Sequence, residues 1–247
     1  MNGLTQLLRP DWPAPATVRA CVTTRAGGIS LPPYDSFNLG DHVGDDPAAV
    51  SENRRRLSEQ FDIHPAWLKQ VHGVVVADAN PAQVMEADAS WTDHAHIACT
   101  VMTADCLPVL FCDRAGTRVA AAHAGWRGLA GGVLEATLER LAVPADQVLV
   151  WLGPAIGPSA FEVGEEVRDA FTAEHPQAAE AFVPGERAGK LLADIYQLAR
   201  IRLAARGITA VYGGGLCTVS DPRFYSYRRT PQGGRFASLV WLDPLCV

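Results

Sequence analysis

Three side chains that can bind a metal ion or take part in catalysis stand where predicted strands end or turn. They are His72 in "KQVHG", Cys106 in "TADCLP" and His123 in "AAHAGWRG". Two imidazoles and one thiolate match a catalytic zinc site, in which three protein ligands leave the fourth position open for water or substrate. The three are too far apart in the sequence for a local motif, so each could instead be a hydrogen-bonded core histidine or a buried thiol.

Cys106 lies between two apolar runs in the stretch "VMTADCLPVLFC", residues 101–112. Each run is typical of a buried strand, whereas Pro108 cannot donate a hydrogen bond to a central strand ladder. The stretch therefore predicts two strands separated by a turn at Asp105 and Cys106. At this turn the thiol could face a site instead of packing in the core.

Two further histidines and one methionine are alternative metal ligands. His94 and His96 would share one face of a strand, but they lie in a polar run that favours surface positions. Met102, together with two histidines and Cys106, would complete a blue-copper ligand set. Seven histidines in all are too few for the trinuclear centre of a multicopper oxidase. Copper oxidase chemistry is therefore disfavoured, and Met102 is predicted to be a core residue.

Five arginines could bind an anion. Arg25 and Arg127 each adjoin a glycine-rich turn, and Arg228, Arg229 and Arg235 form a third group. In a chain with a net charge of -6, arginines at glycine turns could hold a phosphate. Structural salt bridges explain them equally well, so both interpretations stay open. No Walker loop or GxGxxG motif is present to hold a phosphate by backbone amides.

The composition indicates a globular protein that binds neither nucleic acid nor a membrane. Of 247 residues, 48% are hydrophobic and 19% are charged, which suits one large core. The only basic run, residues 54–56, falls on a predicted helix. No segment has the apolar length of a membrane span or a signal peptide, and the six cysteines form no CxxC pair. We therefore expect reduced thiols and a cytoplasmic location.

Hydrophobic periodicity predicts a mixed α and β protein with more than one sheet and no linker, hence a single domain. The predicted strands are residues 17–25, 96–103, 108–113, 118–124, 147–153 and 208–214. The predicted helices are residues 47–61, 125–143, 161–175 and 191–207. A closing hairpin is expected from residues 224–230 and 235–243 across the turn-rich "PQGG".

Ten sequence blocks, in order, resemble the laccase-domain proteins, also named the multicopper polyphenol oxidase family. The blocks are "TTRAGGIS", "FNLGDHVGDDP", "NRRRL", "WLKQVHG", "TADCLPVLF", "AAHAGWRGLAGG", "WLGPAIGPSAFEVGEEV", "GGLCT", "FYSYRR" and "GGRFASLVW", between residues 18 and 242. The resemblance implies an α+β fold, a four-layer α/β/β/α sandwich, as a single domain over residues 1–247. It also implies a zinc-dependent purine nucleoside phosphorylase for adenosine, inosine and methylthioadenosine, with adenosine deaminase activity.

The resemblance also assigns residues. The family's metal ligands correspond to His72, Cys106 and His123, which are also expected to be catalytic together with Asp105. Asp105 beside the thiolate could transfer a proton or orient a ligand imidazole. The expected substrate-binding residues for a purine nucleoside and phosphate are Arg25, Asn38, Gln70 and Arg127. The cofactor is expected to be zinc, copper is doubted, and the chain is expected to be a monomer.

Two other functions stay open on sequence grounds. Some bacterial relatives are linked to the removal of wrongly incorporated serine from cell-wall precursors. An amide hydrolase that edits peptidoglycan precursors would use Cys106 as the nucleophile and His123 as its base, without a metal. A zinc-stabilised binding protein without catalysis is the third class, although three ligands rather than four argue against it.

Overall fold

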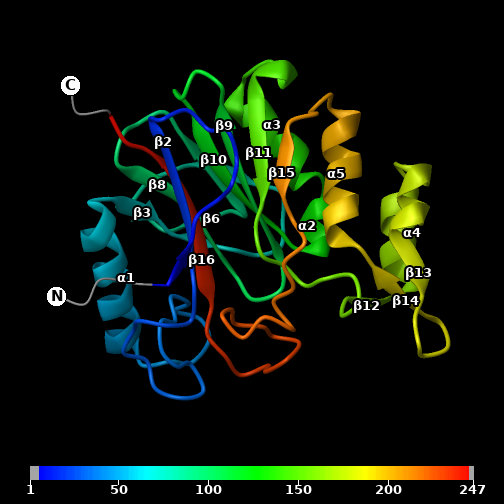
Figure 1. Cartoon of the computed structure of the whole chain (residues 1–247), viewed down its shortest axis with the longest axis horizontal. Coiled ribbons are helices and arrows are strands. Elements are labelled where there is room, and N and C mark those ends of the chain that lie inside the picture. Colours follow the sequence, from blue (N-terminus) through cyan, green and yellow to red (C-terminus); the bar gives the residue numbers. More distant parts are fainter. Residues whose placement is uncertain (1–5, 245–247) are drawn as a thin grey trace.

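Two β-sheets that face each other form the centre of the computed structural model, which describes residues 6–244 (Figure 1). The five-stranded sheet has the strand order β1-β2-β16-β8-β3. Its strands are β1 (Leu7–Leu8), β2 (Val18–Thr23), β16 (Phe236–Leu242), β8 (Ile97–Thr103) and β3 (His64–Ala66). β16 is central and pairs antiparallel with both β2 and β8, so the end of the chain joins its beginning to its middle.

The second sheet has six strands in the order β15-β11-β9-β10-β7-β5. They are β15 (Val211–Gly213), β11 (Val148–Leu152), β9 (Leu107–Asp113), β10 (Val119–Ala124), β7 (Ala89–Thr92) and β5 (Val76–Asp78). β9 and β10 form an antiparallel hairpin, and every residue of both strands is buried. These two strands therefore have both faces covered, which explains why they are almost continuously apolar in sequence.

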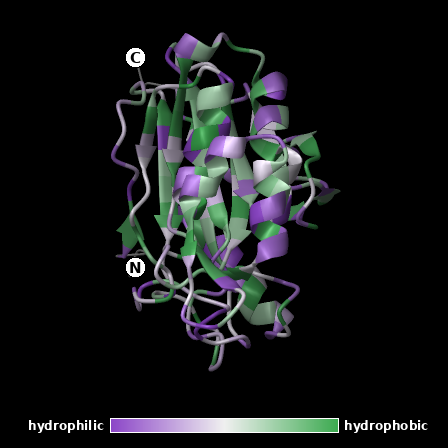
Figure 2. Cartoon of the chain, turned by 90° about the vertical axis from the view of Figure 1, so that its right-hand side faces the viewer, coloured by the Kyte–Doolittle hydropathy of each residue, from purple (hydrophilic) through white to green (hydrophobic). Residues whose placement is uncertain are grey.

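Helices cover the outer faces of the two sheets (Figure 1). α1 (Pro47–Phe61) packs on the five-stranded sheet, where Leu57 joins a buried cluster with Leu239. α2 (Trp126–Gly131), α3 (Val133–Leu141) and α5 (Ile195–Ala205) lie on the six-stranded sheet. Figure 2 shows hydrophobic strands behind helices that carry hydrophilic residues, as expected for amphipathic helices over a buried sheet.

Smaller elements lie at the periphery. They are α4 (Glu165–Thr172), the 3-10 helices Ala145–Gln147 and Pro176–Ala181, the three-stranded sheet β12 (Glu162–Gly164), β14 (Lys190–Ala193) and β13 (Phe182–Pro184), and the pair β4 (Leu68–Lys69) and β6 (Met85–Glu86). Figure 1 places α4 beyond α5, beside β13 and β14 and away from the two large sheets. β4 leads directly into the loop that carries His72.

Local sequence signals explain where the longer helices begin. The carboxylate of Asp46 accepts a hydrogen bond from the N–H of Ala48 at 2.9 Å, and Pro47 occupies the first turn of α1. At the start of α5, the carboxylate of Asp194 accepts from the N–H groups of Tyr196 and Gln197 at 2.9 and 3.0 Å. Both helices therefore start at an aspartate that satisfies otherwise unpaired backbone donors.

Four predicted elements are wrong in detail. The helix expected at residues 125–143 is two helices, because Gly132 takes a left-handed conformation with φ of 101° and ends α2. The segments expected as helices at residues 161–175 and 191–207 begin with strands, β12 and β14, and only their later parts are helical. The expected hairpin is absent from the described residues: only its second half forms a strand, β16, while residues 224–230 fold as turns, in which the N–H of Arg229 donates to Ser226 Oγ.

The mixed fold with several sheets is confirmed, whereas some expectations stay predictions. The count of four layers is one of them, because α4 and the three-stranded sheet lie outside the layers. The others are the single domain over residues 1–247, the monomeric state, the lack of nucleic-acid binding and the cytoplasmic location. Within residues 6–244, no helix is long and apolar enough to span a bilayer. The five described cysteines are free thiols, and Cys246 lies outside the described residues.

Candidate functional site

The β9–β10 hairpin and the loop after β4 bring the three predicted ligands together. In the hairpin, Pro108 pairs with His123 and Leu107 pairs with Ala124. Cys106 immediately precedes β9, so it lies at the same end of the hairpin as His123. The predicted turn between the two apolar runs is confirmed: β8 ends at Thr103 and β9 begins at Leu107.

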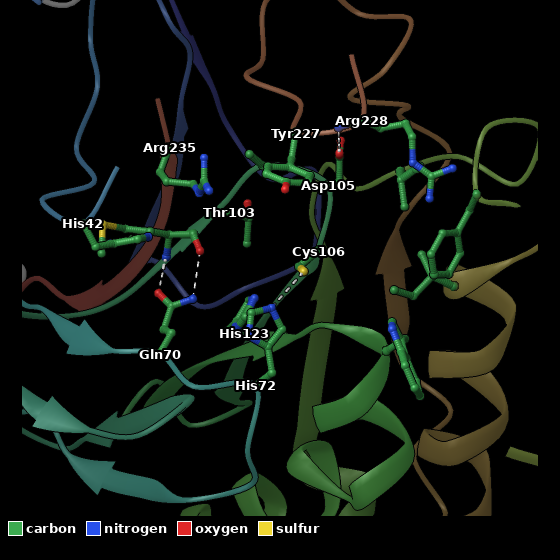
Figure 3. Close-up of a pocket in the computed structure, with 16 residues that line it drawn as sticks. His42, Gln70, His72, Thr103, Asp105, Cys106, His123, Tyr227, Arg228 and Arg235 are labelled. Carbon is green, nitrogen blue, oxygen red and sulfur yellow. Dashed lines mark hydrogen bonds between the residues drawn. The ribbon is translucent and has the colours of Figure 1, made fainter. Parts of the chain in front are cut away.

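The three side chains form one group with metal-binding geometry (Figure 3). Their ligand atoms all lie within 4.8 Å of one another, and Cys106 Sγ is 3.7 Å from His72 Nε2. The imidazoles of His72 and His123 meet edge to face, with ring centroids 4.7 Å apart. Metal–ligand bonds of about 2.0–2.3 Å at tetrahedral angles put donor atoms about 3.5 Å apart. The donor set and its spacing therefore fit a tetrahedral metal ion with three protein ligands.

The fully buried carboxylate of Asp88 holds two of these ligands in place. Its Oδ1 accepts hydrogen bonds from His123 Nδ1 at 2.8 Å and from the N–H of His72 at 2.9 Å. Its Oδ2 accepts from the N–H groups of Gly73 at 2.6 Å and Val71 at 3.2 Å. Since His123 Nδ1 is engaged by the carboxylate, Nε2 is the ring nitrogen left for a metal.

Asp88 was not predicted as a site residue from the sequence. An acidic residue that orients a ligand imidazole was predicted, but at Asp105. The imidazole-orienting contact that sequence assigned to Asp105 is made by Asp88. The carboxylate of Asp105 instead accepts from Thr218 Oγ1 at 2.6 Å and from the N–H of Arg228 at 2.7 Å. The only sequence signal for Asp88 is its position directly before the short strand β7.

Two residues of the site have left-handed backbone conformations, with φ of 62° at His72 and 102° at Asp105. Such a conformation costs a non-glycine residue about 1–3 kcal/mol and persists only where the surroundings hold it. At His72, the backbone N–H donates to Asp88 and fixes the conformation. At Asp105, the side chain accepts from Thr218 and from the N–H of Arg228, which fixes that turn. The backbone is thus fixed at both turns that present the ligands.

Cys106 and His123 influence the protonation of each other. Burial by itself would raise the pKa of the Cys106 thiol. The adjacent His123 and His72 outweigh burial and lower this pKa to about 6. Burial by itself would lower the pKa of the His123 imidazole. Cys106 and Asp88 outweigh burial and raise this pKa to about 9. At neutral pH and without a metal, the two side chains therefore form a thiolate–imidazolium pair. The thiolate is the form that binds metals and attacks carbonyl carbons.

The ligand group opens into a pocket of about 410 Å³, within the size range of small-molecule sites. The other lining residues are His42, Gln70, Met102, Thr103, Ala104, Asp105, Trp126, Ile156, Phe161, Ile195, Tyr227, Arg228 and Arg235. Figure 3 shows Arg235, Thr103 and Tyr227 on the opposite side of Cys106 from His72 and His123. The potential metal ligands thus line one side of the pocket, its floor, and polar side chains line the side opposite.

The predicted substrate-binding residues have different places. Gln70 lines the pocket, but its amide donates to the carbonyl of Met102 and accepts from its N–H, both at 2.8 Å (Figure 3). Arg25, Asn38 and Arg127 do not line it. Arg25 forms an ion pair with Asp35.

The other predicted residues have contacts away from the pocket or lie at the surface. Asn38 is fully buried and binds backbone groups, and Arg127 is exposed and stacks on Trp126. His94 is exposed, and the ring of His96 lies against the carbonyl of Asp62. Neither belongs to the ligand group.

Gly125 leaves no room for a side chain beside the ligands. A Cβ at this position would lie 2.8 Å from His72 Cδ2 and 3.0 Å from Cys106 Sγ. We expect Gly125→Ala to displace both ligands and to weaken metal binding by about tenfold or more, measured by competition with a chelator. Gly131→Ala is the matched control, because its Cβ would meet only the Val74 side chain at 3.1 Å. Equal metal affinity in the two variants would contradict the prediction.

Comparison with known proteins places this site in a family. A family model described as multi-copper polyphenol oxidoreductase laccase matches residues 19–243. The chain belongs to this family. It is 69% identical to a Pseudomonas aeruginosa protein named purine nucleoside phosphorylase, across 96% of this chain and 98% of that one. It is 54% identical to purine nucleoside phosphorylase YfiH of Escherichia coli, across 97% and 100%.

A solved structure of a Neisseria meningitidis protein shares the fold, with a TM-score of 0.94 and 54% identity across 96% of this chain and 99% of that one. The resemblance inferred from the ten sequence blocks is thus confirmed. The family description mentions several copper ions. Among residues 6–244, however, His72, Cys106 and His123 are the only group of three or more potential ligands. The imidazole ligands of a trinuclear copper centre are therefore missing from the described part of the chain.

Proposed function

We propose that this protein is a zinc-dependent purine nucleoside phosphorylase that acts on adenosine, inosine and methylthioadenosine. The observation that carries the proposal is the group of His72, Cys106 and His123 at the floor of a pocket of about 410 Å³. The names of two of its relatives, both purine nucleoside phosphorylases, support the reaction class. The pocket has apolar side chains for a flat base and Arg235 for an anion, which are the two recognition elements a nucleoside and phosphate require.

His72 Nε2, Cys106 Sγ and His123 Nε2 would hold the zinc ion. Two imidazoles and one thiolate with an open fourth position favour zinc over magnesium or calcium, which prefer oxygen ligands. When bound, the ion supplies a Lewis acid next to the substrate. The chain's own contribution is to fix the ligands through Asp88 and to exclude water with the buried walls of the pocket.

The reaction joins a phosphate to the ribose and releases the base. An oxygen of hydrogen phosphate forms a bond to the anomeric carbon as the bond from that carbon to the purine nitrogen breaks. The bonding electron pair leaves with the purine, and the proton of the hydrogen phosphate ends on the base, so the products are ribose 1-phosphate and the free purine. The transition state has oxocarbenium character, as in other glycosyl transfers, so an anion held close to the anomeric carbon stabilises it.

Phosphate dependence of base release tests this proposal. Zinc-loaded protein is incubated with inosine, with and without inorganic phosphate, and hypoxanthine and ribose 1-phosphate are quantified. We expect equal amounts of the two products, formed only when phosphate is present. Absence of hypoxanthine release from protein with confirmed zinc would refute the phosphorylase function.

We further propose adenosine deamination as a second activity of the same pocket. A Lewis acid and an imidazole beside one substrate site are the groups that hydrolytic deamination of a purine needs. Adenosine without phosphate should then yield inosine and ammonia in equal amounts. If zinc-loaded protein forms phosphorolysis products but no ammonia, the second activity is excluded.

A metal-free amide hydrolase is the alternative that one observation favours. Asp88, His123 and Cys106 form a chain in which a carboxylate orients an imidazole beside a thiolate, the arrangement of a cysteine nucleophile with its base. Such an enzyme could edit peptidoglycan precursors. It would keep full hydrolytic activity after metal removal and lose it when iodoacetamide alkylates Cys106. Inactivity of the metal-free protein towards such amides would exclude this alternative.

A further inference from the structure

The pocket contains an arginine, Arg235, on which Cys106 and Asp105 act electrostatically without an ion pair. Arg235 directly precedes β16 and is partly buried, and its Nη1 donates to the carbonyl oxygens of Gly233 and Gly234 at 3.0 and 3.1 Å. None of the described carboxylates forms an ion pair with it. Figure 3 shows its guanidinium directed into the pocket above Cys106. A partly buried cation with unused donors favours a bound anion.

Thr103 supplies an independent sign of a ligand at the same place. It is the last residue of β8 and only 2% exposed, and its Oγ1 has no hydrogen-bond partner among the described residues. Thr103 lines the pocket, and Figure 3 shows its hydroxyl on the side where Arg235 and Tyr227 lie. Since buried hydroxyl groups are normally hydrogen-bonded, an oxygen of a ligand would complete this one.

Hydrogen bonds hold the backbone of Arg235 and of Met102, the residue before Thr103. The side chain of Asn38 accepts a hydrogen bond from the N–H of Arg235 at 2.8 Å, and Asn38 is fully buried. The amide of Gln70 is bound at both ends to the backbone of Met102, the neighbour of Thr103. Asn38 and Gln70 are therefore positioning residues, and a preformed pair of donors binds an anion without a large ordering cost.

Another part of the pocket lining is apolar. Ile156, Phe161 and Ile195 belong to the buried cluster between the six-stranded sheet and its helices, and Trp126 packs against that cluster. Thr103 and Arg235 instead come from β8 and the residue before β16, in the five-stranded sheet. The five-stranded sheet and the residue before β16 thus supply the polar side chains for a charged group, and α2, α5 and the loop after β11 supply the apolar side chains for a flat base.

We propose that Arg235 and Thr103 form the phosphate subsite of this pocket, facing the His72–Cys106–His123 group, with the purine against the Trp126 wall. The proposal rests on the proposed phosphorylase function. In this placement, the guanidinium and the hydroxyl donate to phosphate oxygens, and the ribose lies between the two walls. Arg228 is not part of the subsite, because its guanidinium is exposed and donates to the carbonyl oxygens of Ala160 and Glu162.

The test compares the KM for phosphate with the KM for inosine in zinc-loaded variants. Arg235→Gln and Thr103→Val should each raise the KM for phosphate by about tenfold or more, because each removes a hydrogen bond to a charged ligand. The KM for inosine should change less than twofold. Thr103→Ser keeps the hydroxyl and should retain the wild-type KM for phosphate. Zinc content and circular dichroism confirm that each variant is folded and loaded.

Arg200→Gln is the matched control outside the pocket, because Arg200 also donates only to backbone carbonyl oxygens, of Val211 and Gly213. It should leave both KM values unchanged. An unchanged KM for phosphate in Arg235→Gln and Thr103→Val, or a rise in Arg228→Gln alone, would overturn the subsite while the phosphorylase function stands.

If the wild type releases no hypoxanthine, the phosphorylase function fails, and the subsite is decided by calorimetric titration with inorganic phosphate. Binding that Arg235→Gln weakens by about tenfold or more supports the subsite. Failure of the wild type to bind phosphate overturns it.

Discussion

Cys106→Ala should bind no stoichiometric metal and should lose about 100-fold or more in kcat/KM for phosphate-dependent hypoxanthine release. The substitution removes one of the three ligand atoms, which lie within 4.8 Å of one another. Two imidazoles alone leave a site with too few ligands for tight zinc binding. The change is measured by elemental analysis after gel filtration and by the inosine assay on the same sample.

Cys112→Ala is the matched control for this prediction. Cys112 is a fully buried thiol near the other end of the same strand, where it pairs with Val119. Its loss creates a small cavity, which lowers the free energy of unfolding but does not touch the ligand group. A Cys106→Ala protein that keeps one equivalent of metal would refute the ligand role and favour the nucleophile.

Asp88→Asn should weaken metal binding by about 10–100-fold and lower the free energy of unfolding by about 2–6 kcal/mol. Each carboxylate oxygen of Asp88 accepts two N–H groups: Oδ1 from His72 and His123, Oδ2 from Val71 and Gly73. An asparagine amide can replace only one of these oxygens. In either orientation its NH₂ group faces two donors, so two N–H groups lose their acceptor in a buried place.

Metal affinity from chelator competition and urea unfolding measure the two effects of Asp88→Asn. Asp113→Asn is the matched control, because Asp113 is also a buried aspartate that accepts from Thr117 and Arg118, at the turn of the β9–β10 hairpin. It should lose stability and keep the metal affinity. If Asp88→Asn loses stability alone, like the control, then the carboxylate supports the loop without positioning the ligands.

The sequence predicts those parts of the site that depend on local pattern. The interrupted apolar run between residues 101 and 112 predicts two strands and a turn, and the structure places Cys106 at that turn. Strand ends at His123 and a turn at His72 follow in the same way. Chemistry then selects the three ligands, because a thiolate and two imidazoles at strand ends and turns suit one metal ion.

The sequence cannot predict contacts that join distant segments. Asp88 lies 16 residues from His72 and 35 from His123, and the pairing of β7 with both β10 and β5 brings it to them. The failed hairpin has a similar cause: β16 pairs with β2 and β8 from far away in the chain. Gly132 could have been recognised as a helix break, but helical periodicity continues across it.

Stepwise reconstitution of metal-free protein with zinc tests whether one zinc ion at His72, Cys106 and His123 is required for phosphorolysis. Phosphate-dependent hypoxanthine release is measured after each addition. We expect the wild-type activity to be absent at the start, to rise linearly and to stop rising at one equivalent of zinc per chain. Cys106→Ala should show no rise. Full phosphorolysis by the metal-free protein, or no activity at one equivalent, would contradict it.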